Sequence, residues 1–164
     1  MTSGKKIDMP VSLSYSAGLS LDTAKKMLEA GEKEAKKRGV PVAIAVTDAG
    51  GNLLAFSRMD DASLATIQIA IDKAFTAVFG KRPTGSWKSA FQTGELLPVF
   101  FHERWITFGG GFPIINNGTI LGGIGVSGGT GGLDLYVARA ALGVCGFTLE
   151  DVDAAIAEIE GRKK

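Results

Sequence analysis

The sequence is poor in the residues that mark several classes of protein. Its 164 residues include one cysteine, Cys145, and one histidine, His102. A single cysteine excludes an internal disulfide and a multi-thiolate metal site, and a single histidine argues against multi-ligand zinc. Eighteen basic and seventeen acidic residues give a net charge of +1. No overall electrostatic field therefore attracts nucleic acid or an anionic membrane.

Long apolar runs are absent as well, because glycine, serine or a charged residue interrupts every hydrophobic stretch. No segment approaches the roughly 18 apolar residues of a membrane span, and no basic stretch leads into an apolar segment as in a secretory signal. We therefore expect a soluble, cytoplasmic protein with neither membrane nor nucleic acid as a partner. The length suits a single domain, which we expect over residues 11–164 after a flexible tail at residues 1–10.

Glycine, in contrast, is abundant. It accounts for 23 residues, and 11 of these lie between Gly109 and Gly132, where they alternate with residues that favour strands. The segment Gly123–Gly128 matches the GxGxxG spacing of dinucleotide-binding loops, but the sequence after Leu133 is typical of helix and offers no second parallel strand. We therefore do not expect a Rossmann site, and the sequence also lacks a P-loop motif.

Alternation and capping signals predict the order of the elements. Strands are expected at residues 11–16, 42–47, 53–58, 105–108, 112–115 and 119–126, with helices at 21–38, at 64–79 and after residues 133 and 148, and a weak helix or loop at 84–97. Asp48–Asn52 and Asn116–Gly118 carry the turn residues of β-hairpins. Hairpins imply an antiparallel sheet, so we predict an α+β fold with helices packed against five or six strands.

The helix predicted at residues 64–79 has two unequal faces. Its core stripe is expected to comprise Leu64, Ile67, Ile71, Ala74, Phe75 and Val78. The opposite face places Lys73 among small and apolar residues, with less charge than a solvated face normally carries. Such a lysine must extend to solvent, pair with a carboxylate, or meet a ligand or a neighbouring subunit. The sequence leaves these alternatives open.

A glycine loop at residues 128–132 leads into the helix that begins near Leu133. Free N–H groups at the start of a helix can seat an anion, so Gly128, Gly129 and Thr130 are candidates for holding a carboxylate. The alternative is that these glycines only permit tight turns and close packing of strands.

Charged side chains elsewhere are candidates for anion binding and proton transfer. Arg58, at the end of a predicted strand, is either a partner for an anion or a surface charge. Lys73 and Asp134 are the candidates for proton transfer. Asp48 is a further acid/base candidate, although an aspartate in a turn more often caps the backbone.

His102 lies in an aromatic stretch next to Glu103. A lone histidine beside a carboxylate is a candidate acid/base or a single axial ligand to haem, although such a residue is more often structural. Tyr136 and Cys145 are lesser candidates for that axial role.

Four segments carry a resemblance to a known family: Gly39–Asp60, Ile69–Ala77, Gly110–Ile114 and Gly122–Gly129. In this order they resemble the GlcG/HbpS-like family, and also the C-terminal domain of the PduO corrinoid adenosyltransferases. The resemblance implies a profilin- or PAS-like α+β sandwich and homo-oligomers from dimers to octamers. In several members it also implies haem binding or haem degradation.

Two departures from the family pattern stand out. Members often have a Gln-Asp pair followed by an acidic residue after the glycine loop, whereas this chain keeps only the aspartate, in Leu133-Asp134-Leu135. The stretch around His102 lies outside the matched segments, so the resemblance gives it no metal role.

Three hypotheses follow. The leading one is an oligomeric protein that binds haem or a related tetrapyrrole near a subunit interface, and either degrades it or assists a catabolic pathway. Arg58, Lys73 and the 128–132 loop would then meet the propionates. The second is a cofactor-free enzyme acting on a small carboxylate or carbonyl metabolite, and the third is a non-catalytic assembly protein. The haem and enzyme hypotheses require Lys73 and the late glycine amides to converge on one cavity.

Overall fold

The structure is a computed structural model that describes residues 18–94, 102–130 and 132–161. The tail and the strand predicted before residue 17 lie outside the described residues. None of the helices in the described ranges is long and apolar enough to cross a membrane.

Four strands form one antiparallel sheet in the order β2-β1-β4-β3, which confirms the predicted α+β class. They are β1 (Ala43–Asp48), β2 (Leu53–Arg58), β3 (Gly111–Asn116) and β4 (Thr119–Ser127). Asn117 and Gly118 both have positive φ, at 48° and 76°, as the tight β3–β4 hairpin requires. Both predicted hairpins are confirmed.

One predicted strand is wrong. Residues 105–108 form no strand, so the described part of the chain has four strands where the sequence predicts five. The segment is tied to a helix instead, because the Thr76 hydroxyl donates to the Arg104 carbonyl and accepts the Ile106 N–H, both at 3.1 Å. Backbone groups bonded in this way to a side chain are not free for a neighbouring strand.

The helices lie close to their predicted ranges. They are α1 (Leu21–Lys37), α2 (Ala65–Phe79), the 3₁₀ turn η2 (Thr84–Trp87), α3 (Lys88–Gln92), α4 (Leu133–Gly143) and α5 (Glu150–Gly161). Ser20 caps α1 by accepting the Thr23 N–H at 3.1 Å.

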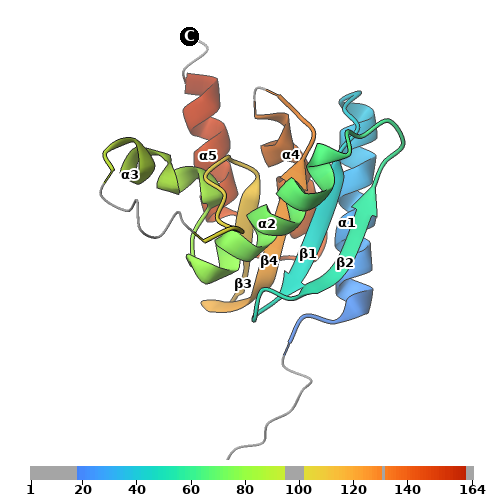
Figure 1. Cartoon of the computed structure of the whole chain (residues 1–164). Helices are drawn as coiled ribbons and strands as arrows, with labels where there is room; N and C mark the ends of the chain where they lie inside the picture. The colour runs from blue at the N-terminus through green and yellow to red at the C-terminus, as the bar shows by residue number, and fades with distance from the viewer. Residues whose placement is uncertain (1–17, 95–101, 131, 162–164) are drawn as a thin grey trace, which may run out of the picture.

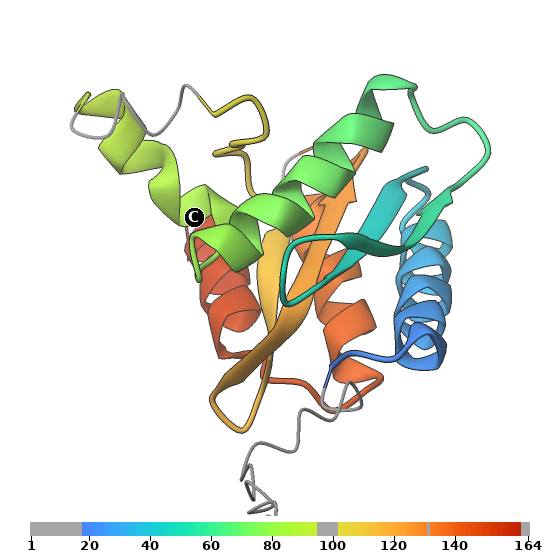
Figure 2. The ribbon, with the colours of Figure 1, turned by 60° about the horizontal axis from the view of Figure 1, so that its bottom comes forward.

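The helices cover the two faces of the sheet unequally. Figures 1 and 2 show α2 alone across one face and α1, α4 and α5 behind the other. Because side chains alternate along a strand, β4 sends Ile124 and Val126 toward the α1/α4 side and glycines toward α2. The main core therefore lies between the sheet and α1, α4 and α5, and a small alanine cluster lies under α2.

The predicted orientation of α2 is wrong in part, because Ala74 and Val78 are buried as predicted but other residues of the expected core stripe are not. Leu64, assigned to the core, is 75% exposed, and Phe75 is only half-buried. The face that packs on the sheet is the one with small residues and Lys73, which is 3% exposed. Small side chains of α2 face the sheet because the helix backbone lies directly against the strand glycines, which leaves no room for large side chains.

Candidate functional site

Lys73 reaches its position because α2 lies directly on the strand glycines. A Cβ atom added to Gly125 would lie 2.0 Å from the Ala70 carbonyl oxygen, and one added to Gly111 would lie 2.5 Å from the Lys73 carbonyl oxygen. Neither space could hold a methyl group. The glycines of β3 and β4 therefore allow α2 to pack closely on the sheet.

Lys73 forms a buried ion pair with Asp134 at the start of α4. Its Nζ atom lies 3.0 Å from Asp134 Oδ2 and donates to the Val126 carbonyl oxygen at 2.7 Å. Among the described residues these are its two hydrogen-bond partners, so the third ammonium N–H has no partner in that part of the chain. Of the three alternatives that the sequence left open for Lys73, the structure shows the pairing with a carboxylate.

Asp134 occupies the position that the sequence suggests for an external anion. Its Oδ1 atom accepts the Gly129 N–H at 2.7 Å, and the residue is 7% exposed. The carboxylate therefore lies between the glycine loop and the buried ammonium, in the first turn of α4, where a negative charge is favourable.

Burial shifts the pKa values of both residues in the direction that favours their uncharged forms. Loss of water lowers the pKa of Lys73, and the charge and hydrogen bond of Asp134 only partly offset it. Loss of water likewise raises the pKa of Asp134, against the opposing effects of Lys73 and the Gly129 N–H. The two pKa values are brought closer together, which makes proton transfer between the partners easier.

An open cavity of about 450 Å³ borders this pair. Lys73, Asp134, Gly128 and Gly129 all line it, so the structure brings four of the predicted site residues to one place. The remaining lining residues are Thr66, Ile69, Phe108, Gly109, Ser127, Gly132 and Leu135. The cavity is thus lined by both apolar and polar residues, as small-molecule sites commonly are.

Phe108 is the lining residue that the sequence placed wrongly, in a strand. It is 69% exposed, and its carbonyl oxygen accepts the Thr84 hydroxyl at 2.5 Å. The same hydroxyl accepts the Gly111 N–H at 3.1 Å. No periodic signal marks such a position, because a single threonine far along the chain holds the loop beside the cavity.

Three other predicted residues do not line the cavity. Arg58 is exposed at the end of β2, and Thr130 is exposed in the glycine loop. Asp48 Oδ1 accepts the N–H groups of Gly50 and Asn52 at 2.8 and 2.9 Å. Partial burial raises the pKa of Asp48, but the hydrogen bonds outweigh this and lower it overall. Asp48 is thus placed as a turn cap.

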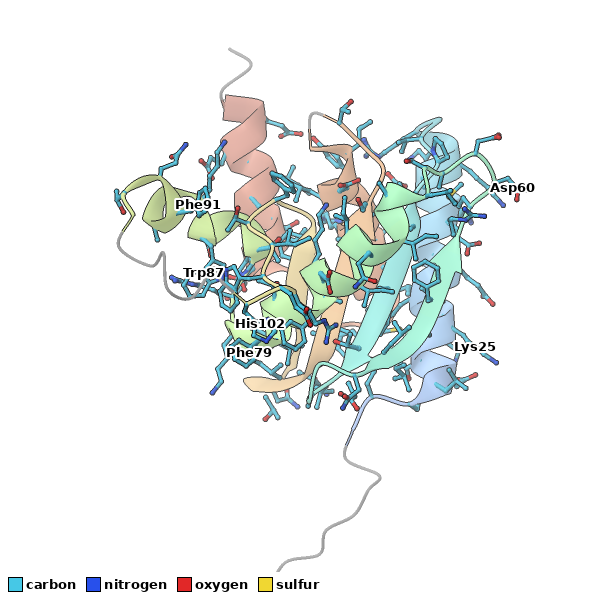
Figure 3. The ribbon with its side chains drawn as sticks, viewed as in Figure 1. Lys25, Asp60, Phe79, Trp87, Phe91 and His102 are labelled. Carbon is cyan, nitrogen blue, oxygen red and sulfur yellow. The ribbon has the colours of Figure 1, made fainter. Side chains whose placement is uncertain are left out.

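His102 belongs to an aromatic cluster on the outer side of α2. Its ring stacks on Phe75, with centroids 5.5 Å apart, and lies 6.0 Å from that of Phe79 (Figure 3). His102 Nδ1 accepts the Arg104 N–H at 3.3 Å, which favours the tautomer with its proton on Nε2. This hydrogen bond and the ring stacking hold His102 in the aromatic cluster, and His102 does not line the cavity.

The surroundings of the two lesser haem-ligand candidates, Tyr136 and Cys145, disfavour the deprotonated forms that would bind iron. The Tyr136 hydroxyl donates to Glu160 at 2.7 Å, which raises the pKa of the phenol and disfavours the phenolate. Burial raises the pKa of the Cys145 thiol and disfavours its thiolate. Within the described ranges, no group of three or more His, Cys, Asp or Glu side chains could hold a metal ion.

Comparison with known proteins decides the family. Residues 19–143 match the family described as "Haem degrading protein HbpS-like". The chain belongs to this family. It is 41% identical to the protein GlcG of Escherichia coli K12 over 110 residues, which are 66% of this chain and 81% of GlcG. The predicted resemblance is therefore confirmed.

The HbpS-like chain is also similar to PduO proteins. It is 35% identical to the corrinoid adenosyltransferase PduO of Citrobacter freundii over 127 residues, 76% of this chain but 38% of PduO. A crystal structure of a PduOC–haem complex superposes with a TM-score of 0.75 at 30% identity. The match covers 80% of this chain and 97% of PduOC, so the likeness is to one part of PduO.

Proposed function

We propose that this protein binds haem or a closely related tetrapyrrole, with a carboxylate-bearing edge directed into the cavity beside Lys73. The observation that carries the proposal is the similarity to PduOC, which forms a haem complex, over nearly all of its length. The cavity fits that edge of the group. Ile69, Phe108 and Leu135 supply apolar wall, and Lys73 has an ammonium N–H to spare.

The cavity fits the iron less well. Among the described residues that line it there is no histidine, cysteine, tyrosine or methionine. We therefore assign the propionates and the macrocycle to this cavity and no axial ligand to it. When bound, haem would supply an iron centre that reacts with oxygen or peroxide, the chemistry that haem degradation would need.

Titration of the haem-free protein with hemin tests the proposal. We expect a Soret shift that saturates at about one equivalent per chain. Esterifying both propionates should weaken binding at least about tenfold, the effect of losing one charge-assisted hydrogen bond. Binding that never saturates, or equal affinity for the diester, would overturn it.

Paired variants test the location. Phe108→Ala should weaken hemin binding, because it removes an apolar wall of the cavity. Phe91→Ala is the matched control, since Phe91 is also exposed, at 47%, but lies on α3 and does not line the cavity (Figure 3). The His102→Ala variant distinguishes the cavity from the aromatic cluster. If this variant loses hemin binding, haem binds at the aromatic cluster and not in the cavity.

We also propose that the chain forms a homo-oligomer through the outer face of α2. Leu64, just before α2, and Phe79, its last residue, are 75% and 61% exposed, and a second copy would remove this apolar surface from water. Light scattering should report dissociation of the Leu64→Glu/Phe79→Glu variant. Leu21→Glu, at a 47% exposed position on α1, should leave the oligomer intact.

A further inference from the structure

Binding an external anion does not by itself explain the Lys73–Asp134 pair, because the two charges already neutralise each other in the ion pair. Both residues border the cavity while remaining almost fully buried. A buried pair of this kind seldom adds stability over apolar residues of the same size. Its position at the wall of an open cavity therefore calls for a chemical explanation.

The two side chains are arranged as a base and an acid side by side. Asp134 is held in place at Oδ1 by the Gly129 N–H, and its Oδ2 lies 3.0 Å from Lys73 Nζ. Lys73 is oriented by the Val126 carbonyl and keeps one N–H for the cavity. A ligand there can thus meet a carboxylate lone pair and an ammonium proton at neighbouring points.

We propose that this pair interconverts the keto and enol forms of a small carbonyl compound without a metal or organic cofactor. Asp134 removes a proton from the carbon next to the carbonyl, and the C–H electron pair becomes the new C=C bond. The carbonyl π electrons move to oxygen, which takes a proton from the Lys73 ammonium. The product is the enol, an isomer of the substrate.

The cycle closes within the pair. After the transfer, Asp134 is a neutral acid and Lys73 a neutral amine, still about 3.0 Å apart. The proton passes directly from Asp134 to Lys73 and restores both charges. Burial helps the enolisation step, because it raises the pKa of Asp134, making a stronger base, and lowers the pKa of Lys73, making a stronger acid.

Deuterium exchange in heavy water tests the proposal on the haem-free protein. With 2-oxobutyrate as the probe, we expect proton NMR to show deuterium entering at carbon 3 at least about tenfold faster with protein than without. Asp134→Asn should reduce the exchange to the buffer rate. The matched control is Asp60→Asn, at an exposed turn (Figure 3) that does not line the cavity, and it should exchange as fast as the wild type.

A second variant guards against misfolding. The double substitution Lys73→Met/Asp134→Leu removes both charges together, so it should fold and yet show no exchange. Buffer-rate exchange with the wild-type protein, or undiminished exchange in the folded double variant, would overturn the proposal. The outcome is independent of the Soret titration, because hemin is absent from the assay.

Discussion

The two faces of the sheet are built on opposite principles. Toward α1 and α4, the strands present large side chains such as Ile44, Ile114 and Ile124, all fully buried. Toward α2, the same strands present glycine and alanine, and the helix backbone rests almost on the sheet. The first face stabilises the fold by burying apolar area, whereas the second fixes the distance between α2 and the strands.

That difference explains where the polar site lies. A lysine on α2 can reach the end of β4 and the first turn of α4 only because no side chain separates the helix from the glycines. On the face with large residues, a charged group would have to displace close-packed hydrocarbon at a prohibitive cost. Lys73 therefore approaches Asp134 from the side of the sheet that is lined with small residues.

The largest effect is expected from breaking the buried pair. Lys73→Met should destabilise the protein by about 3 kcal/mol or more at pH 8, because it leaves the Asp134 carboxylate buried without its cation. The pKa of Asp134, already raised, should rise further. The folded state then holds a proton that the unfolded chain has released, so the variant loses stability as pH rises.

Urea unfolding at pH 5 and pH 8 measures this loss, which should be smaller at pH 5. The double variant Lys73→Met/Asp134→Leu is the control and should lie near the wild type at both values. An equal loss in the single and double variants would show that the charges do not control stability on this face.

Adding one methyl group to the α2 face should be nearly as damaging. Gly125→Ala is expected to cost about 3 kcal/mol, because its Cβ atom would meet the Ala70 carbonyl oxygen and push α2 outward. On the other face damage comes from removal, and Ile124→Ala should cost about 2 to 5 kcal/mol. Gly143→Ala is the control, since its Cβ meets nothing closer than 3.8 Å, and thermal melts should rank the three variants.

The smallest effect is expected at the outer side of α2. Leu64→Ala should change the stability of the isolated chain by less than about 0.5 kcal/mol, because Leu64 is 75% exposed. The same substitution at Leu28, 8% exposed on α1, should cost about 2 to 5 kcal/mol. Unfolding at low protein concentration makes the comparison, and equal losses would contradict the orientation of α2.

Local signals in the sequence predicted most elements correctly. The Ser20 cap, the hairpin residues at Asn117 and Gly118 and the start of α4 act on the nearest few residues, so they can be read from a short window. Hydrophobic spacing alone did not predict the orientation of α2 correctly. Spacing places the large residues toward the core, whereas the glycines that select the face with small residues lie about 50 residues further along the chain.

The linear order of residues was sufficient to determine the α+β class and the family, and to single out Lys73 and the late glycines as candidates. Only the folded chain decided what they do together, because Lys73, Gly129 and Asp134 meet through contacts spanning up to 61 residues. Such contacts depend on the close approach of α2 to β4, a distance set by many side chains at once and encoded by no single motif.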